Sequence, residues 1–159
     1  MKKFKFLEHT ADIKFQAFGN SVKEVFENSA LAMFSAMHEG KVKKTEKKKM
    51  EVKGDDLENL LYNFLEELLF LFDSEGFFLG KIGDLNISKD INSKKQSGRE
   101  KKDKVDDKEG GLKLTSEVIG DNSENYEISI DVKAVTYNEM FVKFDDKKKK
   151  WTAQVVIDV

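Results

Sequence analysis

Apolar and polar residues alternate along much of the chain, which is the pattern of half-buried strands. Ile13, Phe15 and Ala17 follow this period of two up to the turn residues Gly19 and Asn20. Similar alternations or apolar runs predict further strands at residues 77–79, 82–87, 112–115, 128–132, 140–144 and 151–159, and a short edge strand or pair of strands within 41–53.

Two longer segments instead show apolar residues at helical spacing. The first begins at a capping box in residues 21–24, where a serine oxygen and a glutamate can pair with free amides of the first turn. The second begins at residues 55–58, and Phe70 and Leu71 are expected to widen its buried face. Two amphipathic helices and several alternating strands predict a single layered α+β domain with mostly antiparallel β-sheet.

Composition narrows the classes of protein to which the chain can belong. Its 159 residues suit one domain, and the absence of cysteine excludes disulfides, thiolate catalysis and Cys-ligated zinc. The 28 basic and 30 acidic residues nearly balance, so no global field attracts nucleic acid or an anionic membrane. The chain start lacks an apolar signal core and no apolar run approaches a membrane span, so we expect a cytoplasmic protein.

Residues 89–111 differ from the rest of the chain in composition. Lysine, acidic residues, serine and glycine dominate this segment, and large apolar residues are almost absent. Burial there cannot offset the entropy of ordering, so we expect residues 1–159 to form one domain with a charged, flexible loop insertion at about 89–111. The alternative is that its lysines contact RNA, as in a chaperone-like or RNA-binding module.

Two aspartates at opposite ends of the chain are candidates for a metal site. Asp12 lies between two predicted strands, and Asp158 lies in an apolar run beside the terminal residue Val159. Two aspartates and a terminal carboxylate would form an oxygen-only site that suits calcium, magnesium or manganese better than zinc. The alternative is that Asp12 is a turn residue and Asp158 a solvated chain end.

Other charged residues have simpler interpretations. His9 could bind metal or transfer a proton, but we favour a role in holding its loop by a hydrogen bond or packing. His38, near the end of the first helix, is expected to interact with the helix dipole. Glu66 and Glu67 interrupt the apolar face of the second helix, and we expect them at its margin facing water.

Common enzyme motifs are missing. Gly80 and Gly83 are expected to mark bends or bulges rather than a phosphate cradle, because no helix start follows them. A metal-dependent hydrolase is a weaker alternative, because no nucleophile pair or convincing base constellation accompanies the aspartates.

Four motifs, taken in order, resemble those of the archease family. The resemblance covers nearly the whole chain except the charged insertion, and it rests on residues 6–13 (FLEHTADI), residues 55–69 with the core FLEELL, residues 132–137 (VKAVTY) and residues 156–159 (VIDV). One departure is Asn138, since family members often have histidine after the Thr-Tyr pair.

The resemblance implies a small α+β accessory protein that is not an enzyme by itself. Archeases activate the RtcB-type RNA ligase of tRNA splicing, so the implied partner is that ligase, with tRNA contacted only through it and with no DNA or membrane partner. They promote ligase guanylylation by GTP and repeated turnover. The resemblance further implies a divalent cation, calcium first and magnesium or manganese as alternatives, held by Asp12, Asp158 and Val159, with Lys133 as the activating lysine.

Overall fold

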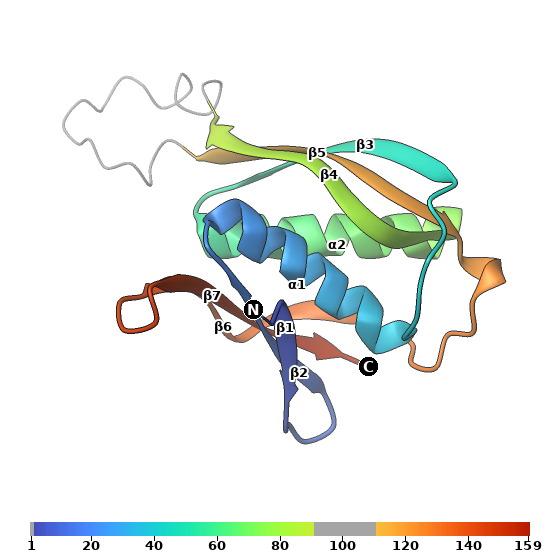
Figure 1. Ribbon diagram of the computed structural model, residues 1–159, viewed down its shortest axis with the longest axis horizontal. Helices are drawn as coiled ribbons and strands as arrows, with labels where there is room; N and C mark the ends of the chain where they lie inside the picture. The colour runs from blue at the N-terminus through green and yellow to red at the C-terminus, as the bar shows by residue number, and fades with distance from the viewer. Residues whose placement is uncertain (1, 91–110) are drawn as a thin grey trace.

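The computed structural model describes residues 2–90 and 111–159, and it has three layers, with two helices between two antiparallel sheets (Figure 1). One sheet has the strand order β1-β2-β7-β6 and the other β3-β5-β4, which confirms the predicted layered α+β class. The elements are β1 (Phe4–Leu7), β2 (Ile13–Gly19), α1 (Val22–Met37), β3 (Glu46–Gly54), α2 (Leu57–Glu75), β4 (Phe77–Lys89), β5 (Leu112–Asn122), a 3-10 turn (Ser123–Asn125), β6 (Ala134–Asp145) and β7 (Lys150–Asp158).

The helix starts confirm the predicted capping. Ser21 Oγ accepts the amide of Glu24 at 3.1 Å, and the Glu24 carboxylate accepts the amide of Asn20 at 2.7 Å. Asp56 caps α2 by accepting the amide of Asn59 at 2.8 Å. These side chains satisfy amides that would otherwise have no partner in the first turn, so each helix begins at a defined residue.

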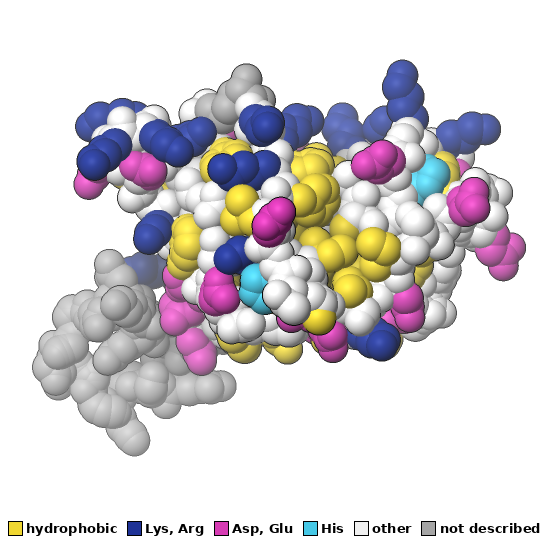
Figure 2. Space-filling view, turned by 90° about the horizontal axis from the view of Figure 1, so that it is seen from below, with side chains coloured by type: hydrophobic (Ala, Val, Ile, Leu, Met, Phe, Trp, Pro, Cys, Tyr) yellow, Lys and Arg dark blue, Asp and Glu magenta, His cyan; other side chains and the backbone are white. Residues whose placement is uncertain are grey.

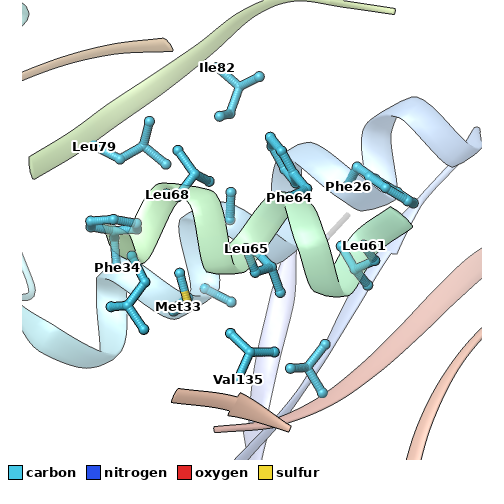
Figure 3. Packing of buried hydrophobic residues seen from close by; sticks show 14 of the residues in the cluster. Phe26, Met33, Phe34, Leu61, Phe64, Leu65, Leu68, Leu79, Ile82 and Val135 are labelled. Carbon is cyan, nitrogen blue, oxygen red and sulfur yellow. The ribbon is translucent and has the colours of Figure 1, made fainter. Parts of the chain in front are cut away.

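The apolar faces of both helices meet in the middle layer. Figure 3 shows Leu79 and Ile82 of β4 on one side of α2 and Val135 of β6 on the other. The Phe26 and Phe64 rings join α1 to α2, with centroids 6.0 Å apart. Because each helix packs on both sheets, one core fixes the relation between the two sheets.

The expected width of the α2 apolar face is partly wrong. Leu71 is buried, but Phe70 is 57% exposed. Residue 70 therefore lies on an open strip of the helix, and hydropathy alone cannot show where the covering layers stop.

Glu66 also differs from expectation. Its carboxylate accepts the amide of Val135 at 2.8 Å, and Glu58, two turns earlier, accepts the amide of Val142 at 3.1 Å. Both amides belong to β6, an edge strand of the four-stranded sheet. The glutamates therefore satisfy outward amides of this edge, which strand pairing leaves free.

The β4–β5 hairpin confirms the predicted irregularities. The register between the strands shifts after Leu79 and again after Gly83, as expected for bulges at the two glycines. At the far end Lys89 pairs with Leu112, so the strands continue to the borders of the predicted insertion. Most of the insertion predicted at about 89–111, namely residues 91–110, lies outside the described residues.

The strand predicted at residues 128–132 is wrong. This segment is irregular and crosses the C-terminal end of α1, where the Ser129 amide donates to the Met37 carbonyl at 2.9 Å. His38, the C-cap of α1, lies 3.0 Å from the Glu127 carbonyl through Nδ1. The backbone of this segment forms hydrogen bonds with the end of α1 instead of with a neighbouring strand. Alternation in the sequence could not reveal this difference.

Hydrogen bonds to the Asp121 carboxylate connect the segment before β3 to the end of β5. Its carboxylate accepts hydrogen bonds from the hydroxyls of Thr45 and Tyr126, both at 2.6 Å, and from the Asn125 amide at 3.3 Å. These donors, Thr45 first, hold the pKa of Asp121 well below its usual range.

Protonation of Asp121 in acid is therefore expected to lower the free energy of unfolding. A carboxyl group with a lowered folded-state pKa stabilises the fold above its unfolded pKa of about 4, and it loses that contribution as pH falls further. Urea unfolding should show a lower midpoint for Asp121→Asn than for wild type at pH 7. The difference should narrow between pH 5 and pH 2, and a difference that does not change with pH would contradict this role.

Candidate functional site

The pairing of β2 with β7 brings the two ends of the chain together. Ile13 is the partner of Ile157, the last pair in that ladder. The next residues are Asp12 and Asp158, so the two aspartates lie at the same end of the sheet, which we call the acidic end. Asp12 is partly buried and Asp158 is exposed.

Lys133 and Val159 lie at the same end. Ala134 pairs with Asp158, and the amide of Lys133 donates to the Asp158 carbonyl at 2.8 Å. The Lys133 side chain is exposed, whereas the Val159 side chain packs against the core. The four residues predicted from the sequence are thus gathered at one end of the β2-β7-β6 part of the sheet.

His9 is held by a contact that the sequence did not predict. Its Nε2 lies 3.4 Å from the Glu139 carboxylate, and Lys14 Nζ contacts the same carboxylate at 2.9 Å. These two contacts, Lys14 first, lower the pKa of Glu139 below its ordinary value. The contact agrees with the expectation that His9 holds its loop.

A bulge in β6 explains why Glu139 was missed. The register of β6 against β7 shifts between Thr136 and Phe141, and Glu139 has a φ of 56°, a left-handed conformation uncommon outside glycine. The bulge turns Glu139 toward Lys14 of β2 and His9 of the β1–β2 loop. No feature of the sequence marks a bulge at this point, although alternation does place Lys14 opposite the core face.

The residues at the acidic end fit a hard cation by their chemistry. Their side-chain donors are carboxylate oxygens, which calcium, magnesium and manganese prefer. The buried Nδ1 of His9 has no hydrogen-bond partner, and it lies 3.9 Å from the Asp12 carboxylate. Within residues 2–90 and 111–159, no three Asp, Glu or His side chains are grouped to hold a metal by themselves.

An open depression of about 470 Å³ adjoins the acidic end. Asp12 and Ile13 form part of its wall, together with Phe6 of β1 and the end of α1 at Ser35 and Ala36. Phe6 is 45% exposed on this face. The acidic end thus borders a surface of mixed apolar and polar residues that is open to solvent.

Comparison with known proteins decides the family. The sequence profile of the Archease protein family (MTH1598/TM1083) matches residues 4–159. The chain belongs to the archease family. It is 37% identical to the protein archease of Pyrococcus abyssi, with 100% of both chains covered. It is 35% identical to that of Methanosarcina acetivorans, with 99% of this chain and 97% of the other covered.

A solved structure agrees with this assignment. The solution structure of protein 1598 of Methanobacterium thermoautotrophicum superposes with a TM-score of 0.73 at 34% identity, with 100% of both chains covered. In this archease the first and last family motifs supply Asp12 and Asp158, which strand pairing brings together. Across the described part of the chain, neither helix is long and apolar enough to cross a membrane.

Proposed function

We propose that this archease is an accessory activator of an RtcB-type RNA ligase in tRNA splicing or RNA repair, and that it acts through the acidic end. Through this end it promotes guanylylation of the ligase by GTP and repeated turnover, and it contacts tRNA there only through the ligase. Family membership supports the accessory role. The observation on which the proposal depends most is that β2–β7 pairing places Asp12 and Asp158 together, with Lys133 beside them.

In this proposal Asp12, Asp158 and the Val159 carboxylate hold a divalent cation, calcium first, with magnesium or manganese as alternatives. A cation held there supplies positive charge next to the phosphates of GTP or of the guanylylated ligase. The chain itself contributes rigidity. Val159 packs on the core, Asp158 is paired with Ala134 of β6, and His9 is fixed by Glu139. Carboxylates held this way need little reordering when they bind a cation.

Lys133 has a separate role. Its backbone is tied to the Asp158 carbonyl while its side chain stays exposed, so the ammonium group can reach a phosphate outside the protein. A lysine beside two carboxylates also offsets part of their repulsion. Lys133 therefore assists activation, and the ligase performs the chemistry.

Guanylylation of the purified ligase by labelled GTP tests the proposal. With Asp12→Ala or Asp158→Ala, stimulation should fall at least 100-fold, to the level of the ligase alone. Lys133→Ala should give a smaller but clear loss. Asp146→Ala is the matched control, because Asp146 is an exposed aspartate on the turn that joins β6 to β7, far from the acidic end along β7.

Circular dichroism would verify that each variant is folded. Stimulation at the wild-type level by both aspartate variants would refute the activating role of the acidic end, and loss of stimulation in Asp146→Ala would show that the effect is not local.

A further inference from the structure

Two adjoining depressions lie away from the acidic end and form one groove. The larger has a volume of about 1040 Å³ and the smaller about 560 Å³, and both are lined by Leu31 of α1, Lys44 and Gly80 of β4. The groove runs between α1, the segment before β3, and β4. We call it the lysine groove, because its lining includes Lys2, Lys3, Lys41, Lys43, Lys44 and Lys81.

All six lysines are exposed, and none forms an ion pair with another described residue. The lining contains three acidic residues, and two of them accept hydrogen bonds from neighbouring groups. Asp121 accepts three side-chain hydrogen bonds, and Glu24 accepts the Asn20 amide. Glu27 is the third, and partial burial raises its pKa. The groove therefore has an excess of positive charge although the whole chain is nearly neutral.

Aromatic rings form one wall of the groove. Phe78 stacks on Tyr126, with centroids 5.6 Å apart and planes at 30°, and the His38 ring lies 5.2 Å from Tyr126. Phe78 is buried, whereas Tyr126 and His38 are partly exposed. Partly exposed aromatic rings beside a basic groove are a combination found in sites for single-stranded nucleic acid, where bases stack on the rings and phosphates contact the lysines.

The backbone that carries Lys43 and Lys44 is anchored before any ligand binds. The amide of Lys43 donates to the Tyr126 hydroxyl at 2.8 Å, and Tyr126 in turn donates to Asp121. The Thr45 amide donates to the Gly120 carbonyl at 2.8 Å. An anchored backbone reduces the entropy lost when a ligand binds to the side chains that it presents.

Position separates this groove from the acidic end. The only lining residue that the larger depression shares with the depression beside Asp12 is Ser35. Figure 2, which views the molecule from the side of the four-stranded sheet, shows lysine side chains mostly along the upper edge rather than over the middle of this face. We infer that the lysine groove binds a single-stranded nucleic acid segment, held by its phosphates and independent of sequence.

Fluorescence anisotropy with a labelled 12-nucleotide oligouridine tests the inference on the full chain. Lys41→Gln/Lys43→Gln/Lys44→Gln should weaken binding at least tenfold at low salt. The matched control Lys147→Gln/Lys148→Gln/Lys149→Gln removes the same charge from another exposed lysine run, on the β6–β7 turn, and should change affinity less than threefold. Deletion of residues 94–108 should have an equally small effect.

Salt dependence gives a second measurement. Each phosphate contact with a single strand contributes about 0.7 to the slope of log affinity against log salt, so losing three contacts should reduce the slope by about 2. Absence of binding by the wild type, equal losses in both triple variants, loss on deletion of 94–108, or an unchanged slope would each overturn the inference. Circular dichroism of every variant excludes unfolding as the cause of a loss.

Discussion

Phe64→Ala is expected to lower the free energy of unfolding by about 3–5 kcal/mol, the range for truncating a buried phenylalanine. Phe64 is fully buried in the middle of α2, where it packs against Phe26 of α1. Truncation removes this contact and leaves a cavity at the centre of the three layers. Because domains are stable by only about 5–15 kcal/mol, urea unfolding should show a large decrease in the midpoint.

Phe70→Ala is the matched control for this prediction, because it makes the same truncation on the same helix at a 57% exposed side chain. Its free energy of unfolding should stay within about 0.5 kcal/mol of wild type. If the two variants were equally destabilised, the division of α2 into a covered face and an open strip would be wrong.

Gly120→Ala is expected to destabilise the three-stranded sheet by about 3 kcal/mol or more. A Cβ atom at Gly120 would lie 2.0 Å from the Phe78 carbonyl oxygen, which belongs to the paired strand β4. Backbone atoms cannot move aside as a flexible side chain can, so β4 and β5 would have to separate. Thermal unfolding monitored by circular dichroism measures the loss.

Gly83→Ala serves as the control on the neighbouring strand. There the nearest atom to the added Cβ is the Glu117 carbonyl oxygen at 3.4 Å, an ordinary contact. This variant should remain within about 1 kcal/mol of wild type. A Gly120→Ala protein as stable as Gly83→Ala would show that the two strands are not as closely paired as described.

The parts of the fold that follow from local pattern were predictable. The helices begin at Ser21 and Asp56 because capping depends on neighbours in sequence, and the alternation that ends at Gly19 produced β2. The segment around Ser129 was not predictable, since its apolar residues alternate as in a strand while its hydrogen bonds go to the end of α1. Phe70 was misplaced for a related reason, because hydropathy does not show which side of a helix a second layer covers.

The candidate site likewise contains residues that the sequence could predict and one that it could not. Asp12 and Asp158 stood out as acidic residues in apolar surroundings, and the pairing of Ile13 with Ile157 places them at one end of the sheet. Their binding of a cation stays a prediction. Glu139 could not be found from sequence, because its contact with His9 depends on the register shift in β6 and on a positive φ.

Calcium titration by isothermal calorimetry tests the central claim, that the acidic end binds a divalent cation, most directly. The wild-type protein should bind one calcium ion per chain, and both Asp12→Ala and Asp158→Ala should weaken binding at least tenfold while Asp146→Ala retains it. Magnesium and manganese titrations would rank the three cations at the same site. The absence of binding heat with all three cations in the wild type, or binding that is unchanged in both aspartate variants, would contradict the account.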